Sequence, residues 1–215
     1  MHDYQEDFIR FALDRGVLRF GRFTLKSGRE SPYFFNTGLF NSGTALSKLG
    51  RCYVEALTRA QVDFDLVYGP AYKGIPLATG LAMALAETRG RDVPYAFDRK
   101  EEKDHGEGGR LVGAPVEGRR AVIVDDVVSS GQSIREAAEL IRAADGTIAA
   151  VAIALDRKER GEDAVSAVRE VEQRLGAPVI PIITLDHLEE YLSDQGGRDD
   201  TLEAIRTYRR RYGAE

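Results

Sequence analysis

One stretch of the chain, AVIVDDVVSSGQS at residues 121–133, constrains the fold and the chemistry more than any other. Its apolar start runs directly into two adjacent carboxylates, Asp125 and Asp126. An unbroken apolar run is typical of a parallel strand that is covered on both faces. In open α/β sheets, ligands bind at the C-terminal ends of such strands. The stretch therefore predicts a parallel sheet with an acidic ligand site at its edge.

The turn after the two carboxylates combines the features of an anion site. It offers backbone N–H groups, hydroxyls and the start of a helical pattern, and a helix N-terminus attracts negative charge. Its residues are Val128, Ser129, Ser130, Gly131, Gln132 and Ser133. A ribose 5-phosphate needs both kinds of group, because its hydroxyls can bind carboxylates and its phosphate can bind the turn. The segment therefore predicts an enzyme that acts on a sugar phosphate.

Other protein classes also place paired acids after an apolar run. P-loop ATPases do so, but the chain contains no G-x-x-x-x-G-K-[ST] motif. Receiver domains carry their acid pair near the N-terminus, whereas Asp125 and Asp126 lie past the middle of the chain. The spacing alone leaves the ribose-phosphate interpretation and other uses of the motif open.

Composition narrows the class of protein. The 215 residues are 43% hydrophobic and 30% charged, which is typical of an ordinary globular protein. The formal net charge of −5 argues against a nucleic-acid partner. No apolar run reaches the length of a membrane span, and the N-terminal sequence lacks the pattern of a signal peptide. Cys52 is the only cysteine and lies in an apolar helical pattern, so we expect it to pack in a reducing compartment. We therefore expect a cytoplasmic protein with no nucleic-acid and no membrane partner.

The hydrophobic pattern predicts an α/β fold. Expected strands cover residues 19–25, 32–36, 65–68, 93–97, 121–124, 147–155 and 179–184, and expected helices cover residues 3–15, 44–60, 74–88, 134–144, 163–175, 188–193 and 201–212. From residue 65 onward strands and helices alternate, which indicates a mostly parallel central sheet flanked by helices. We expect a single domain, residues 1–215. Its core, roughly residues 44–185, carries a small hood made of roughly residues 1–40 and the C-terminal helices.

Two further segments place cations after predicted strands. In LVYGPAYKGIP, Tyr72 and Lys73 lie in a glycine- and proline-containing turn whose amides can approach a phosphate, although an ordinary βα turn fits as well. Residues 99–110 are charged and glycine-rich, and we expect a loop there. That loop is either a solvated surface segment or a lid. As a lid it would bring Arg99, Lys103 and His105 onto a pyrophosphate.

The remaining candidates concern a flat ligand and its charge. In FTLKSGRESPYFFN, Phe34 and Phe35 are adjacent and point to opposite faces of a strand, so one can pack while the other meets a ring. Lys26 lies in the turn beside them, and a solvated lysine on an amphipathic hairpin is the alternative. In LDRKERG, Arg157 follows another predicted strand and can pair with a carboxylate, although a surface arginine is the default.

Together these segments resemble a known family. VIVDDVVSSGQS looks like the ribose-phosphate signature of type I phosphoribosyltransferases. FTLKSGRESPYFFN, GPAYKGIP, RKEEKDHGEGG and LDRKERG, in this order, resemble the bacterial orotate branch of that family, over essentially the whole chain. The resemblance implies the type I phosphoribosyltransferase fold. It also implies transfer from 5-phosphoribosyl 1-diphosphate (PRPP) to orotate, which gives orotidine 5′-monophosphate and pyrophosphate in UMP biosynthesis.

The resemblance also implies roles for individual residues. Those expected to bind PRPP are Lys26, Tyr72, Lys73, Arg99, Lys100, Lys103, His105, Asp125, Asp126, Val127, Val128, Ser129, Ser130, Gly131, Gln132 and Ser133. Those expected to bind orotate are Phe34, Phe35, Ser129 and Arg157, with Arg157 near the orotate carboxylate. Lys103, Asp125 and Asp126 are the expected catalytic residues. Mg²⁺ is expected as cofactor, held mainly through substrate and water.

A homodimer with shared active sites is also implied by the resemblance. Arg99, Lys103 and His105 would reach the neighbouring subunit's site, whereas Lys100 would act within its own subunit. One departure is the pair at 129 and 130, Ser-Ser where the family often has Thr-Ala. The hydroxyl at 129 is kept, so we expect the contacts to persist with a looser loop. A phosphoribosyltransferase for another base and a non-catalytic PRPP-sensing regulator remain as alternatives.

Overall fold

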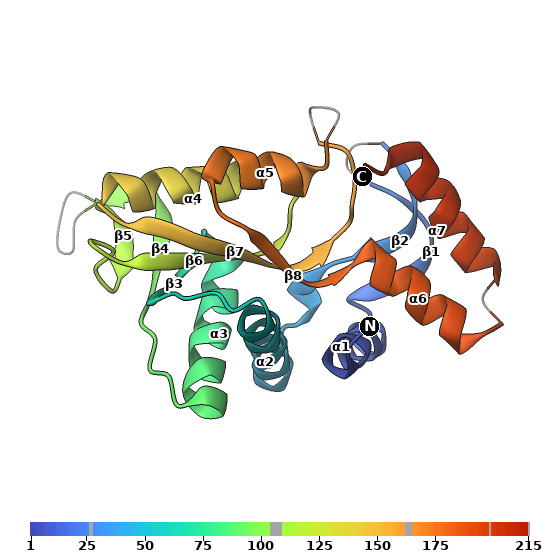
Figure 1. Ribbon diagram of the computed structural model, residues 1–215, viewed down its shortest axis with the longest axis horizontal. Coiled ribbons are helices and arrows are strands. Elements are labelled where there is room, and N and C mark those ends of the chain that lie inside the picture. Colours follow the sequence, from blue (N-terminus) through green and yellow to red (C-terminus); the bar gives the residue numbers. More distant parts are fainter. Residues whose placement is uncertain (26–27, 104–108, 162–164, 198, 215) are drawn as a thin grey trace.

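The computed structural model of the protein describes residues 1–25, 28–103, 109–161, 165–197 and 199–214. Within these residues the chain forms a six-stranded sheet in the order β5-β4-β3-β6-β7-β8 (Figure 1). Its strands are β3 (Leu66–Gly69), β4 (Tyr95–Lys103), β5 (Gly109–Gly113), β6 (Arg120–Val127), β7 (Thr147–Asp156) and β8 (Val179–Thr184). Neighbouring strands are parallel except β4 and β5, which form an antiparallel pair at one edge. The predicted mostly parallel sheet is confirmed.

Helices cover both faces of the sheet. In Figure 1, α2 (Gly43–Arg59) and α3 (Gly74–Arg89) lie on one face, and α4 (Gln132–Ala143) and α5 (Ala167–Leu175) lie on the other. Strand β6 explains why its apolar run is unbroken. Val122 and Val124 belong to one buried cluster, while Ala121 and Ile123 belong to the other. Because consecutive strand residues point to opposite faces, a strand covered on both sides must be apolar at every position.

The close approach of α2 and α3 depends on glycine. A Cβ atom at Gly50 of α2 would lie 2.3 Å from the backbone oxygen of Gly80 on α3. The absence of a side chain at Gly50 lets the two backbones touch, so this helix pair packs as one layer against the sheet.

The remaining elements form the hood. They are α1 (Asp3–Asp14), β1 (Leu18–Thr24), β2 (Glu30–Phe35), the 3₁₀-helix η1 (Thr37–Leu39), α6 (Leu185–Gln195) and α7 (Asp199–Tyr212). β1 and β2 form a separate antiparallel two-stranded sheet. In Figure 1 these elements gather at the β8 side of the main sheet, where both chain termini also lie.

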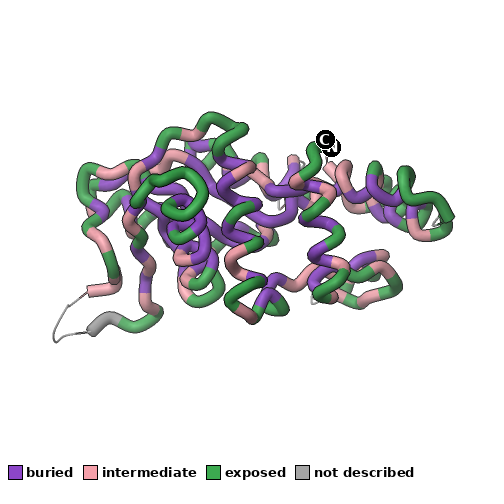
Figure 2. Tube along the Cα trace, turned by 90° about the horizontal axis from the view of Figure 1, so that it is seen from below, coloured by how far each residue is buried: buried purple, intermediate pink, exposed green. Residues whose placement is uncertain are grey.

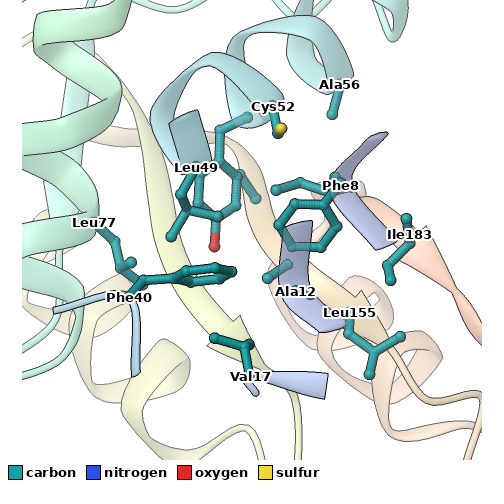
Figure 3. Close-up of a cluster of buried hydrophobic side chains, with 14 of the residues drawn as sticks. Phe8, Ala12, Val17, Phe40, Leu49, Cys52, Ala56, Leu77, Leu155 and Ile183 are labelled. Atoms are coloured by element: carbon teal, nitrogen blue, oxygen red, sulfur yellow. The ribbon is translucent and has the colours of Figure 1, made fainter. Parts of the chain in front are cut away.

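The hood and the core share one set of buried side chains. Phe8 and Ala12 of α1 lie beside Leu49 of α2, Leu155 of β7 and Ile183 of β8 (Figure 3), and all are buried in a single cluster. Figure 2 shows buried residues in both the sheet region and the hood. This packing agrees with the expected single domain, which stays a prediction.

Several element boundaries differ from the sequence-based expectation, and two of these differences have a clear physical reason. Residues 99–110 were expected to be a loop, but β4 continues to Lys103 and β5 begins at Gly109, with Lys103 opposite Gly109. Backbone pairing between two polar segments forms this hairpin, and such pairing has no hydrophobic signature. The helix expected at residues 163–175 begins at Ala167, because Ser166 caps it by accepting a hydrogen bond from the Arg169 N–H. Among the described residues, no helix is both long and apolar enough to cross a membrane.

Candidate active site

Predicted motifs follow four neighbouring strands of the sheet. β4, β3, β6 and β7 are adjacent and parallel, so their C-terminal ends meet at one edge. Lys73 comes shortly after β3, Asp125 and Asp126 lie near the end of β6, and Arg157 directly follows β7. The fold therefore brings the acid pair together with cations that are distant in the sequence, at the edge where open α/β sheets bind ligands.

The acid pair is buried and fully partnered. Asp125 and Asp126 are each 8% exposed. The Ser133 hydroxyl donates to Asp125 Oδ2 at 2.8 Å, whereas Lys73 Nζ donates to Asp126 Oδ2 at 2.8 Å. Backbone N–H groups donate to the other oxygens, from Asp126 to Asp125 Oδ1 at 2.8 Å and from Val127 to Asp126 Oδ1 at 2.9 Å. These bonds fix both carboxylates in place on opposite sides of the strand.

Two hydroxyl groups that the sequence did not indicate complete this arrangement. The Thr37 hydroxyl donates to Asp126 Oδ2 at 2.8 Å, and the buried Tyr53 hydroxyl of α2 donates to the backbone oxygen of Asp125 at 2.8 Å. Thr37 belongs to η1, directly after the hood hairpin. Neither residue lies in a recognisable motif, since one follows an aromatic strand and the other sits on the apolar face of a helix.

The environment of the acid pair shifts its protonation. Burial and the negative charge of the adjacent Asp126 raise the pKa of Asp125 to about 6. The Asp125 carboxylate is therefore a hydrogen-bond acceptor at neutral pH and becomes protonated in mildly acidic solution.

The turn between β6 and α4 has the geometry of an anion site. Ser129 and Ser130 are exposed, and α4 begins directly after Gly131. Gly131 has φ +67°, and a Cβ atom there would lie 2.7 Å from Val171 Cγ2. Glycine is therefore required for this tight turn. The turn presents the N-terminus of α4 to the same edge as the acid pair, and the Gln132 N–H there donates to Ser130 Oγ at 3.4 Å.

The turn after β3 exposes its two candidate residues. Tyr72 is 69% exposed and the Lys73 side chain is 60% exposed, so both are accessible to a ligand. The Asp98 carboxylate of β4 holds the start of this turn. Its Oδ1 accepts hydrogen bonds from the Ala71 N–H at 3.0 Å and from the Tyr68 hydroxyl at 3.3 Å. Asp98 directly precedes Arg99 and Lys100, so the turn and the β4–β5 hairpin share an anchor that was not predicted.

The two adjacent phenylalanines of the hood lie in different surroundings. The Phe35 ring packs toward the core, with its centroid 6.5 Å from that of Phe8. The Phe34 ring lies 5.6 Å from that of Phe23, and the Arg19 guanidinium lies 5.2 Å from the Phe34 ring. The packing of Phe35 agrees with the expectation that one of the two rings packs, and the contact of the other with a flat ligand ring stays a prediction.

Arg157 is held beside the hood. Its Nε donates to the Tyr33 hydroxyl of β2 at 3.1 Å, and its guanidinium lies 5.1 Å from the Tyr33 ring. The side chain is only 18% exposed, and its Nη2 is buried without a hydrogen-bond partner. A buried guanidinium N–H group without a partner is costly, so it marks a place for an acceptor from a ligand.

Three predicted residues cannot be compared with the geometry. Lys26 and His105 fall outside the described residues, as does the side chain of Lys103. Among the described residues, no group of three or more histidine, cysteine, aspartate or glutamate side chains could hold a metal ion.

Comparisons with known proteins agree with this geometry. The family model described as the phosphoribosyl transferase domain matches residues 45–181. The orotate phosphoribosyltransferase of Halorhodospira halophila is 86% identical over 214 residues, and that of Nitrosococcus oceani is 55% identical over 215 residues. The matches cover 100% of this chain in both cases, and 100% and 98% of the relatives. The crystal structure of orotate phosphoribosyltransferase from Francisella tularensis superposes with a TM-score of 0.88 at 38% identity, covering 97% of this chain and 100% of that one.

Proposed function

This chain belongs to the orotate phosphoribosyltransferases of the phosphoribosyltransferase family, and we propose that it transfers the phosphoribosyl group of PRPP to orotate. The products are orotidine 5′-monophosphate and pyrophosphate, in pyrimidine biosynthesis. The observation that supports this most strongly is the meeting of a buried acid pair, an anion-binding turn and an arginine with a free buried N–H group at one edge of the sheet.

The ribose-phosphate half of the substrate fits the end of β6. Asp125 and Asp126 would accept hydrogen bonds from the ribose hydroxyls, and the turn of residues 127–133 would bind the 5′-phosphate. The exposed hydroxyls of Ser129 and Ser130 and the N-terminus of α4 support this role. Tyr72 and Lys73 would contact the diphosphate, because Lys73 bridges from Asp126 toward solvent.

Orotate would bind between the hood and β7. Its carboxylate needs a cationic donor, and Arg157 Nη2 is a buried donor without a partner. Phe34 and Phe35 belong to the hood strand that carries Tyr33, which contacts Arg157. Lys26, Arg99, Lys100, Lys103 and His105 would complete the site.

The reaction follows from the charges at this edge. The bond between the anomeric carbon and the diphosphate oxygen breaks, and the N1 nitrogen of orotate bonds to that carbon from the opposite face. The N1 proton of orotate is released to the departing pyrophosphate or to water. Positive charge develops on the ribose and negative charge on the leaving pyrophosphate. Asp125 and Asp126 lie on the ribose side, while Lys73 and Lys103 would neutralise the leaving group. Preorganised charges of this kind stabilise a transition state more than a ground state.

The residues present fit Mg²⁺ bound chiefly to the substrate. All four carboxylate oxygens of Asp125 and Asp126 already accept protein hydrogen bonds, and the described residues offer no cluster of metal ligands. The acid pair would hold the ion through the ribose hydroxyls and water. When bound, Mg²⁺ supplies charge neutralisation on the diphosphate.

We also propose a homodimer with shared sites and a cytoplasmic location. Arg99 and Lys103 lie in the part of β4 beyond Phe97, its last residue paired with β3, where β4 pairs with β5 alone. A strand that extends beyond the sheet can reach a neighbouring subunit, which supports a lid that acts across the dimer. The lone buried cysteine is compatible with a reducing compartment.

Ultraviolet loss of orotate tests the proposed function. The protein is mixed with PRPP and Mg²⁺ and offered orotate, uracil or hypoxanthine in parallel. Magnesium-dependent consumption of orotate alone is the expected result. Consumption of another base would support a phosphoribosyltransferase of different specificity. Saturable PRPP binding without turnover of any base would support the regulator and overturn the proposal.

A further inference from the structure

Arg157 is part of a network that reaches the C-terminal helix. Glu159 lies two positions further along the same loop, and its Oε1 is 3.1 Å from Arg157 Nε. The same Oε1 accepts a hydrogen bond from the Tyr208 hydroxyl of α7 at 2.8 Å. The side chains of Arg157 and Glu159 are 18% and 16% exposed, so this ion pair is screened little by solvent.

Glu159 is restrained from more than one side. Besides Tyr208, its Oε2 lies 3.6 Å from Arg29 Nη1 in the hood. Burial raises the pKa of the Tyr208 hydroxyl above its usual value, so the group stays protonated and donates to Glu159. Tyr208 also packs edge-on against Tyr33, with ring centroids 6.1 Å apart. The two tyrosines therefore hold one member each of the Arg157–Glu159 pair, Tyr33 the arginine and Tyr208 the glutamate.

The C-terminal tail clamps the backbone of this loop. The Arg160 N–H donates to the Tyr212 oxygen at 2.9 Å, and the Ala214 N–H donates to the Lys158 oxygen at 3.0 Å. Glu159 and Gly213 form an antiparallel bridge. Tyr212 and Ala214 thus hydrogen-bond to the residues on either side of Glu159. In this way α7 and the residues after it fix the loop that carries Arg157.

The consequence concerns which face of the guanidinium is left for a ligand. Tyr33 and Glu159 both occupy the Nε edge of Arg157, whereas Nη2 is buried and has no partner. If Glu159 were not held by Tyr208, its carboxylate could rotate onto Nη2 and neutralise the one donor that a ligand needs. Fixing Glu159 therefore keeps that donor free.

We propose that Glu159 and Tyr208 are positioning residues that aim Arg157 Nη2 at the carboxylate of the base and thereby determine the preference for a carboxylated pyrimidine. This inference rests on the proposed function, because it assigns the carboxylate to Arg157. Base selection would then depend on α7, a helix that lies far along the chain from the sheet edge and would not itself contact the base.

Two nucleotides that differ only in the carboxylate provide the test. Orotidine 5′-monophosphate carries it and uridine 5′-monophosphate does not, so the ratio of their Kd values isolates the contribution of that group. Titration calorimetry measures both ligands on the wild type, Arg157→Ala, Tyr208→Phe, Glu159→Ala and Glu159→Gln. Tyr212→Phe is the matched control, because it removes a hydroxyl one turn further along the same helix. Binding of uridine 5′-monophosphate reports that each variant is folded.

We expect Tyr208→Phe to raise the Kd for orotidine 5′-monophosphate about tenfold. This is the size of effect that follows the loss of a hydrogen bond to a charged group. Binding of uridine 5′-monophosphate and the Tyr212→Phe control should be unchanged. Glu159→Ala should weaken binding of orotidine 5′-monophosphate as much, because Arg157 Nε loses its ion-pair partner and the guanidinium is no longer held in place. Glu159→Gln should regain part of that binding, because glutamine keeps an acceptor for Tyr208.

The outcomes separate the two proposals. If the wild type does not prefer the carboxylated nucleotide, or if Arg157→Ala keeps the preference, the assignment of Arg157 fails. If Arg157→Ala abolishes the preference but Tyr208→Phe retains it, only the positioning role fails. Tighter binding of orotidine 5′-monophosphate by Glu159→Ala would also overturn that role, since Glu159 would then act only by repulsion.

Discussion

Thr37 and Asp126 are 89 residues apart in the chain, and the hydroxyl of Thr37 donates a 2.8 Å hydrogen bond to Asp126 Oδ2. Both residues are buried. Thr37 follows the hood strand that carries Tyr33, Phe34 and Phe35, so this bond ties the hood to the acid pair. A second tie joins Tyr33 to Arg157. The half of the site expected to bind the base is therefore fixed directly to the half expected to bind the ribose.

Removing this bond should affect PRPP more than orotate. Thr37→Val keeps the shape but leaves Asp126 Oδ2 with Lys73 alone, and we expect a loss of about 1–2 kcal/mol in unfolding free energy. The KM for PRPP should rise about fivefold, which matches about 1 kcal/mol. Thr37→Ser retains the hydroxyl and serves as the control. Urea unfolding and initial rates measure the two effects, and equal behaviour of the valine and serine variants would contradict the prediction.

The raised pKa of Asp125 predicts a pH-dependent stability penalty. The carboxyl has a pKa of about 6 in the folded protein, against about 3.9 in an unfolded chain. The folded state therefore holds the proton more tightly, and the penalty for ionisation develops as the pH rises from about 4 to about 6. Asp125→Asn does not titrate, so its stability relative to the wild type should increase by about 1–2 kcal/mol across that window. Denaturant unfolding at both ends measures this, and a pH-independent difference would contradict it.

The turn at Gly131 should tolerate no side chain. Gly131→Ala combines a positive φ with a Cβ position 2.7 Å from Val171 Cγ2, so its turn must shift. Gly90→Ala is the matched control, because Gly90 has φ +61° and open space around it. In both variants the unfavourable backbone conformation should lower the free energy of unfolding by about 1 kcal/mol. Gly131→Ala should lower it further, because its Cβ atom also has no space. Only Gly131→Ala should raise the KM for PRPP, which initial rates at varied PRPP would reveal.

Lys103 should act in the chemical step. We expect Lys103→Ala to lower kcat by roughly 10²–10³, as for the loss of one preorganised charge-stabilising group. The KM values should change less. A normal kcat in this variant would remove Lys103 from the mechanism.

Subunit mixing tests whether Lys103 acts across the dimer. Lys103→Ala and Asp126→Asn chains are each expected to be inactive, but a hybrid dimer would contain one intact site. Random reassociation should restore about a quarter of the wild-type activity. Each variant mixed with itself is the control. A mixture that stays as inactive as the two parent variants would contradict the shared site.

Local patterns predicted the elements that carry the chemistry. The apolar run that ends at Asp125 and Asp126 appears as β6, and the helical pattern after Gly131 appears as α4. These predictions succeed because strand burial, turn geometry and helix amphipathicity are all properties of short segments. In the folded chain, the order of the parallel strands then places Lys73 and Arg157 at the same edge of the sheet.

The contacts that hold the site are not visible in such patterns. Thr37, Tyr53 and Tyr208 each act through one hydroxyl that meets a partner distant in the sequence. A buried hydroxyl with a partner and an ordinary packed side chain look alike in a single sequence. The extension of β4 to Lys103 was missed for a related reason, because pairing of a strand end made of charged residues depends on its backbone.

A crystal structure with orotate and PRPP bound tests the central claim most directly. The account predicts the orotate carboxylate within hydrogen-bonding distance of Arg157 Nη2. It also predicts the ribose hydroxyls on Asp125 and Asp126, and the 5′-phosphate in the turn of residues 127–133. An orotate carboxylate bound away from Arg157, or a ribose that does not touch the acid pair, would contradict it.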